Sequence, residues 1–155
     1  VTWSCDGYRF FGYIDRVDSF EDGTVRIVDY KTGKVEDKDV NITDDNAQSV
    51  ADALFKEDND SRPKIALQLF LYGKYVDDEP WMKGRNMVNV IYPAASLFTT
   101  PVSEMEKPRS GRFGEIVLEK LKETLAEMTD PTRDFRRTTS AKTCGYCDFR
   151  NICGR

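Results

Sequence analysis

The 155-residue sequence contains no histidine. This absence excludes Ser-His-Asp and Cys-His nucleophilic catalysis within the chain, and it removes imidazole from the available metal ligands. The sequence also lacks an apolar run of membrane-spanning length and a recognisable signal peptide. We therefore expect a cytoplasmic protein with no membrane partner.

Basic residues are scarce in the middle of the chain and concentrated at its end. Residues 35–60 carry nine acidic side chains and two lysines, a net charge of −7, whereas residues 131–155 carry six basic and two acidic side chains, a net charge of +4. The overall charge of −4 therefore hides two segments of opposite sign. We expect the basic end to face an anion while the acidic segment points elsewhere.

Hydrophobic periodicity and turn residues predict a single α/β or α+β domain with a mixed sheet. Asp6-Gly7 is a favoured two-residue hairpin turn, and Glu21-Asp22-Gly23 is a second turn, so the chain should begin with a three-stranded antiparallel meander. We expect residues 1–130 to form the core, with 35–60 as an acidic excursion that holds a short helix, and residues 131–155 to form a basic, cysteine-containing tail. The further elements expected are a helix over 63–76, strands at 86–93 and 97–102, and a helix over 111–130.

The stretch IVDYKTGK places an acid and a base at the end of a hydrophobic strand. If Glu21-Asp22-Gly23 is a three-residue turn, Asp15 lies directly opposite Asp29, and Lys31 shares their face because side chains alternate along a strand. Two facing carboxylates repel each other, and a divalent cation such as Mg²⁺ would resolve the repulsion. A two-residue turn would shift the register by one and separate the three side chains.

A structural interpretation of these residues also stays open. Asp29 and Lys31 can be exposed strand ends, with Asp15 paired to Arg16 or Arg26. Gln68 and Tyr72 lie four residues apart and therefore share a helical face. They are either a polar pair directed at the acids or a solvent-facing glutamine and a core tyrosine.

Three cysteines close to the C-terminus form the pattern C-x₂-C-x₅-C: Cys144, Cys147 and Cys153. In a chain with no sign of secretion, thiols this close favour a metal centre over disulfides. The alternative is that they are small buried hydrophobic side chains. Zinc needs four ligands, and no histidine is present to complete the set.

The motifs GYIDRVD, IVDYKTG and QLFLY, in this order, resemble those of the RecB-like branch of the PD-(D/E)XK nuclease superfamily. The resemblance spans residues 12–153 and is strongest to the AddB-type subunit of bacterial helicase–nucleases, with similarity to CRISPR-adaptation nucleases. It implies a restriction-endonuclease-like fold and hydrolysis of DNA phosphodiesters with Mg²⁺ or Mn²⁺. It assigns metal binding to Asp15, Asp29 and the backbone carbonyl of Tyr30, the catalytic lysine to Lys31, and a motif that flanks the active site to Gln68 and Tyr72.

The resemblance also implies an iron–sulfur centre in the intact protein. Cys144, Cys147 and Cys153 match three of the four cysteines that hold a [4Fe–4S] cluster in the related nucleases, whereas Cys5 lies in the wrong region to be the fourth. The chain opens on Val1 rather than methionine, and the N-terminal core helix of the family has no counterpart, so we expect a fragment of a longer protein. Such a fragment can lack the cluster and activity, unless Glu57 or another acid of residues 35–60 completes the metal site.

Two functions follow from these observations. The first is a metal-dependent deoxyribonuclease domain, an exonuclease by expectation, that belongs to a helicase–nuclease or a recombination and repair protein and has DNA and a helicase domain or subunit as partners. Phe135, Arg136, Arg137 and Lys142 would then help to hold a DNA strand. The second is a non-catalytic DNA-binding or structural module that keeps the nuclease fold and uses the cysteines as a metal clip.

Overall fold

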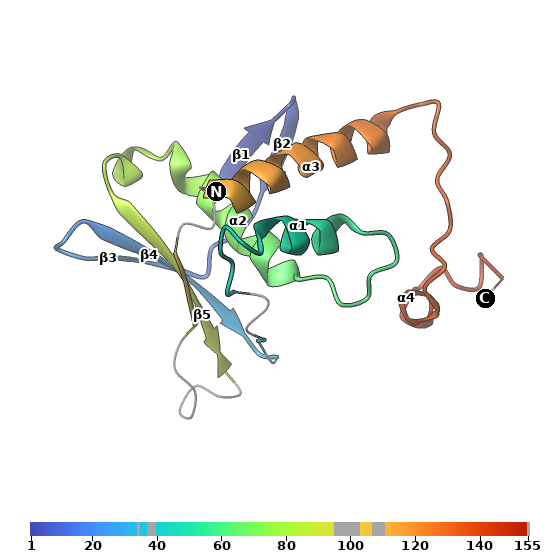
Figure 1. The fold of residues 1–155 in the computed structure, drawn as a ribbon, viewed down its shortest axis with the longest axis horizontal. Helices are drawn as coiled ribbons and strands as arrows, with labels where there is room; N and C mark the ends of the chain where they lie inside the picture. Colours follow the sequence, from blue (N-terminus) through green and yellow to red (C-terminus); the bar gives the residue numbers. More distant parts are fainter. Residues whose placement is uncertain (34, 37–39, 95–102, 107–110, 155) are drawn as a thin grey trace.

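The computed structural model of the chain describes residues 1–33, 35–36, 40–94, 103–106 and 111–154. Its strands form two sheets (Figure 1): β1 pairs with β2, and the larger sheet has the order β3-β4-β5-β6. Because β4 and β5 are parallel while the outer pairs are antiparallel, the predicted α+β class with a mixed sheet is confirmed. The elements are β1 (Thr2–Cys5), β2 (Tyr8–Phe11), β3 (Arg16–Ser19), β4 (Thr24–Lys31), α1 (Ala47–Phe55), α2 (Lys64–Asp77), the 3-10 turn η2 (Pro80–Met82), β5 (Asn86–Pro93), β6 (Ser103–Glu106), α3 (Gly111–Thr129) and α4 (Ala141–Gly145).

The first hairpin has the predicted two-residue turn. Asp6 and Gly7 both have positive φ angles, 47° and 82°, and Cys5 pairs with Tyr8. The prediction that residues 8–20 continue as one strand of a three-stranded meander is wrong, because the chain leaves β2 before it enters β3 in the other sheet. The break occurs at Gly12, where a Cβ atom would lie 3.1 Å from the Tyr75 ring of α2.

The second hairpin fixes the register on which the predicted site depends. The amide of Phe20 donates to the carbonyl oxygen of Thr24 at 2.9 Å, and Gly23 has a φ of 85°, so residues 21–23 form a three-residue turn. Arg16 consequently pairs with Val28, and the next facing positions are Asp15 and Asp29. The condition required for the acids to face each other is therefore met.

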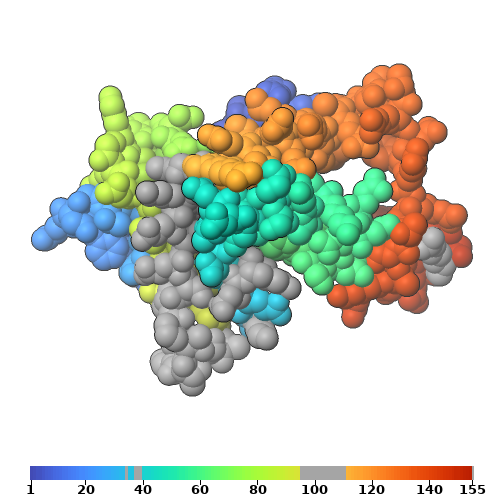
Figure 2. Space-filling view, in the orientation of Figure 1, coloured from blue at the N-terminus to red at the C-terminus, as the bar shows by residue number. Residues whose placement is uncertain are grey.

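Helix α2 forms the centre of the molecule. One of its sides packs on the larger sheet through Leu69, Tyr72 and Val76, which cluster with Val25 and Ile27 of β4. Its opposite side, including Ala66 and Phe70, packs against α1 and α3. Figure 2 shows α1 and α3 side by side over this part of the molecule, with the C-terminal tail at one end. Because α2 is buried from both sides, the polar side chains that it carries are firmly positioned.

All three predicted helices are present, and the differences concern other elements. Helices α1, α2 and α3 and strand β5 occupy the expected segments. β6 and α4 were not expected, and the strand predicted at 97–102 lies outside the described residues. The apolar stripe of α3 is buried at Val117 and Leu121, but Met128 at its C-terminal end is 60% exposed. No helix in the described part of the chain is long and apolar enough to span a membrane.

We expect Gly23→Ala to destabilise the protein by about 1–2 kcal/mol, because an L side chain at positive φ places Cβ against the backbone. Gly33→Ala is the matched control, since Gly33 has no atom within 4 Å of the added Cβ and no positive φ. It should change the free energy of unfolding by less than about 0.5 kcal/mol. Urea unfolding of both variants measures the difference, and equal stabilities would contradict the strained turn.

Candidate active site

The alternation of side chains along β4 places Asp29 and Lys31 against α2. Val25 and Ile27 point into the core that α2 covers, so the side chains two and four positions after Ile27 emerge on the same face. Asp29 is only 2% exposed. The interpretation of Asp29 as an exposed strand end is therefore wrong.

Polar side chains of α2 hold both residues. Gln68 accepts a hydrogen bond from Lys31 Nζ through Oε1 at 2.5 Å and donates from Nε2 to Asp29 Oδ1 at 2.9 Å. The Tyr72 hydroxyl donates to the same Oδ1 at 3.1 Å and accepts from Gln68 Nε2 at 2.6 Å. The four side chains form one connected network, which fixes the lysine relative to the aspartate.

The second oxygen of Asp29 differs from the first in its partners. Asp29 Oδ2 is buried and lies 2.9 Å from Lys31 Nζ as an ion pair, but within the described part of the chain it accepts no well-directed hydrogen bond. A buried carboxylate oxygen in this state costs free energy. Buried polar atoms without such a partner are a reason to look for a ligand at the site.

Burial raises the pKa of Tyr72 to about 12. The hydrogen bond from Gln68 opposes this rise in pKa, and the negative charges of Asp29 and Asp15 contribute to it. Tyr72 therefore stays protonated at neutral pH and keeps its role as a donor to Asp29.

Asp15 lies just before β3 at the rim of this site. It is exposed, and its Oδ2 accepts a hydrogen bond from the amide of Tyr30 at 2.9 Å. The alternative in which Asp15 pairs with an arginine is wrong, because Arg16 and Arg26 both bind Asp18. A hydrogen bond thus joins the Asp15 side chain to the backbone of Tyr30, the residue that follows Asp29.

The oxygen donors at this place suit a hard divalent cation. Mg²⁺ typically takes one or two carboxylates and completes its shell with water and substrate phosphate. Asp29 offers a buried oxygen that accepts no hydrogen bond, and Asp15 offers an exposed carboxylate beside it. The Tyr30 carbonyl stays a predicted ligand. The described residues contain no group of three or more His, Cys, Asp or Glu able to hold a metal, so two carboxylates are what this part of the chain offers here.

The three C-terminal cysteines lie on and after α4, at the end of the molecule away from the β3–β4–β5 sheet (Figure 1). All four cysteines of the chain are thiols rather than disulfides, and in the described residues they form no metal-binding group. Cys5 is buried on β1, where burial raises the pKa of its thiol. A raised pKa makes Cys5 a poor thiolate ligand.

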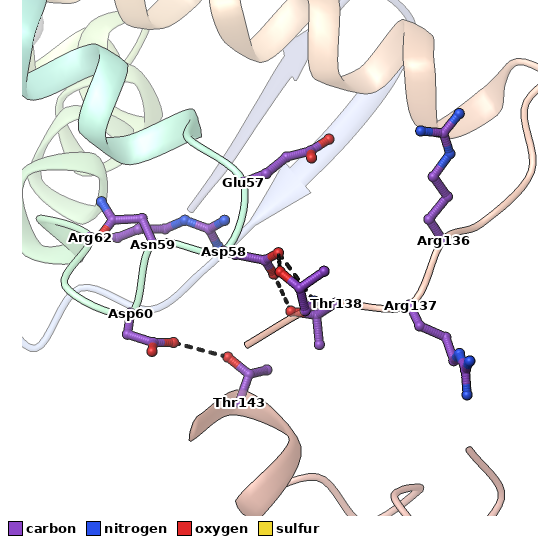
Figure 3. Close-up of a pocket in the computed structure, with 10 residues that line it drawn as sticks. Glu57, Asp58, Asn59, Asp60, Arg62, Arg136, Arg137, Thr138 and Thr143 are labelled. Carbon is purple, nitrogen blue, oxygen red and sulfur yellow. Dashed lines mark hydrogen bonds between the residues drawn. The ribbon is translucent and has the colours of Figure 1, made fainter. Parts of the chain in front are cut away.

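The tail that carries these cysteines docks on the loop after α1. Asp58 accepts hydrogen bonds from the hydroxyls of Thr138 and Thr139, and Asp60 accepts one from Ser140 at 2.7 Å. A cavity of about 500 Å³ lies between the two segments (Figure 3). Glu57, the acid considered as a further metal ligand, lines this cavity and forms no metal-binding group with Asp15 and Asp29.

The tail residues predicted to hold DNA lie beside these hydrogen bonds between the tail and the loop after α1. Arg136 and Arg137 line the cavity, and Figure 3 shows both side chains extending away from Asp58. Arg137 donates to the carbonyl oxygen of Cys153 at 2.7 Å, and Phe135 is 92% exposed. The sequence alone did not predict the hydrogen bonds between the tail and the loop after α1, because Asp58 and Thr138 are 80 residues apart. The run of hydroxyl residues at 138–140 was the available signal.

We expect the double substitution of Asp58 and Asp60 by Asn to release the tail, because hydrogen bonds to a neutral amide are weaker than those to a carboxylate. Trypsin should then cleave the tail arginines faster than in the wild type. Asp45→Asn, an exposed acid of the same segment, is the matched control. An unchanged rate of cleavage in the double variant would show that Asp58 and Asp60 do not hold the tail in place.

Release of the tail should also depend on pH. Hydrogen bonds from Thr138 and Thr139 lower the pKa of Asp58 from 3.8 to about 2. A folded-state pKa below the unfolded value means that the stabilising contribution is present above pH 3.8 and is lost as the pH falls towards 2. Amide exchange at residues 138–143, corrected for its intrinsic pH dependence, should accelerate across this interval. A flat profile would count against the contact.

Comparison with known families supplies the context for this geometry. A family model described as the PD-(D/E)XK nuclease superfamily matches residues 1–154. No curated protein and no solved structure gives a significant match.

Proposed function

This chain belongs to the PD-(D/E)XK nuclease superfamily, and we propose that it is a divalent-metal-dependent deoxyribonuclease domain. The observation that carries the proposal is the network around Asp29, in which one helix holds an acid and a lysine of β4 beside a second acid. A mainly structural role would not require a buried carboxylate oxygen that has an ion pair but no well-directed hydrogen bond.

In this proposal each side chain has a distinct part. Asp29 and Asp15 hold the cation, with the Tyr30 carbonyl as a further ligand. Lys31 places a positive charge where negative charge develops on the phosphoryl oxygens. Gln68 and Tyr72 are positioning residues, since they orient Lys31 and Asp29 and need not touch the reacting atoms.

The cation, Mg²⁺ or Mn²⁺, would polarise a phosphoryl oxygen and make a nearby water more acidic. The chain's own contribution is to hold the two carboxylates on one side of a rigid hairpin. A site that is assembled before the substrate arrives loses less free energy to reorganisation at the moment of reaction.

We expect Asp29→Asn and Lys31→Ala each to lower DNA hydrolysis at least about 100-fold, because each removes a charge placed for the transition state. Fluorescently end-labelled single- and double-stranded DNA with Mg²⁺ or Mn²⁺ provides the measurement. The circular dichroism spectrum should not change.

Matched controls come from the same elements. Asp18→Asn alters a carboxylate of the same hairpin that binds arginines, and Lys74→Ala alters an α2 lysine whose side chain is exposed to a similar extent, 22% against 26% for Lys31. Both controls should cleave DNA like the wild type.

Unchanged activity in Asp29→Asn and Lys31→Ala would refute the catalytic assignment. A folded wild type that binds DNA without cleaving it would favour a non-catalytic module.

We further propose that the domain acts as an exonuclease in a cytoplasmic helicase–nuclease or a recombination and repair protein, with DNA and a helicase domain or subunit as partners. The support for this context is the resemblance of its motifs to the AddB-type subunit. A covalently closed single-stranded circle should resist digestion while a linear strand of the same sequence is degraded. Cleavage of the circle would indicate endonuclease action instead.

We also propose that Cys144, Cys147 and Cys153 are thiolate ligands of a [4Fe–4S] cluster in the intact protein. Support comes from their spacing and from a tail that the Asp58 and Asp60 hydrogen bonds hold in place. Protein purified without oxygen should contain iron and acid-labile sulfide in equal amounts, and Cys147→Ser should lower both. Cys5→Ser is the control that should retain them. Tightly bound zinc without iron would contradict the proposal.

A further inference from the structure

A second cavity, of about 320 Å³, lies next to the network around Asp29. Gln68 and Tyr72 line it and also belong to that network. A group bound in this cavity would therefore contact the helix that orients the lysine and the acid. The cavity shares Gln68 and Tyr72 with this network, and it shares no lining residue with the cavity beneath the tail.

The opposite wall is the segment between β2 and β3, which is anchored on α2. The Tyr75 hydroxyl donates to the carbonyl oxygen of Phe11 at 3.2 Å, and the neighbouring Gly12 lies so close to Tyr75 that a Cβ atom would come within 3.1 Å of its ring. Tyr13 follows directly and lines the cavity, but its side chain is 87% exposed. An aromatic ring is thus presented to solvent next to a backbone segment that contacts α2.

The chemistry of the walls is specific enough to suggest an occupant. Leu67, Leu71 and the tyrosine rings supply flat apolar surface, and Lys64 supplies a cation at the start of α2. An exposed aromatic ring beside a positive charge is the combination with which proteins hold nucleic-acid strands, because a base stacks on the ring and a phosphate meets the cation. A volume of this size also falls in the range of small-molecule sites.

We propose that this cavity is a subsite for one nucleobase of the DNA substrate, which stacks on Tyr13 while an adjoining phosphate meets Lys64. The proposal rests on the proposed nuclease function and adds a specificity residue to it. Both faces of a paired base inside a duplex are already stacked on neighbouring bases, so only an unpaired base can stack on the Tyr13 ring. Stacking is tolerant of sequence, and all four bases should enter.

The test is binding without catalysis, measured by fluorescence anisotropy in EDTA with a labelled single-stranded oligonucleotide. Tyr13→Ala should weaken binding about fivefold or more, the typical cost of one lost stacking contact. Tyr13→Phe should bind like the wild type, because it retains the ring. A duplex closed by hairpin loops at both ends serves as a second probe, and Tyr13→Ala should bind it unchanged.

Tyr146→Ala is the matched control, since that tyrosine is 88% exposed but lies in the tail. It should not reproduce the loss. The subsite is refuted if Tyr13→Ala binds the single strand normally, if it weakens both probes equally, or if Tyr13→Phe behaves like Tyr13→Ala. An equal loss in Tyr146→Ala would likewise overturn it by showing general aromatic attraction.

The experiments distinguish a failure of the base subsite from a failure of the proposed nuclease function. If Tyr13→Ala loses single-strand binding while the wild type cleaves no DNA, the nuclease proposal fails and the base subsite stands. If DNA cleavage depends on Asp29 but Tyr13→Ala binds and cleaves normally, the subsite alone fails. In the combined positive case, Tyr13→Ala should raise KM for a single strand by a similar factor with little change in kcat.

Discussion

The burial of Asp29 against α2 is the contact on which the rest of the site depends. A carboxylate that is 2% exposed requires compensating partners, and Gln68, Tyr72 and Lys31 provide them from one helix and the same strand. The compensation is incomplete, because Oδ2 accepts no well-directed hydrogen bond among the described residues. The protein thus keeps a polar group in its interior at a cost to its stability, as expected where function and stability compete.

The position of α2 explains how such a site is held rigid. The helix is packed on the larger sheet on one side and on α1 and α3 on the other, so its polar residues cannot move without disturbing two hydrophobic clusters. The same helix also supports the segment of Tyr13 through the Tyr75 hydroxyl. One central element therefore positions the acid, the lysine and the wall of the neighbouring cavity.

The acidic segment 35–60 and the basic tail, residues 131–155, contact each other. Among the described acidic residues of the 35–60 segment, Asp58 and Asp60 bind the hydroxyls of the tail. The basic tail is consequently held at the end of the molecule away from the β3–β4–β5 sheet (Figure 1), and its Arg136 and Arg137 line a separate cavity. Long-range hydrogen bonds, rather than net charge, decide where the two segments meet.

Local rules were sufficient to predict much of the site from the sequence. The Glu21-Asp22-Gly23 turn sets the hairpin register, strand alternation places Asp29 and Lys31 on one face, and a spacing of four places Gln68 beside Tyr72. Only the tertiary structure decided that this face is buried, that the chain breaks at Gly12 against Tyr75, and that the tail binds Asp58. Those features depend on contacts between residues far apart in the chain, which periodicity and turn propensity do not encode.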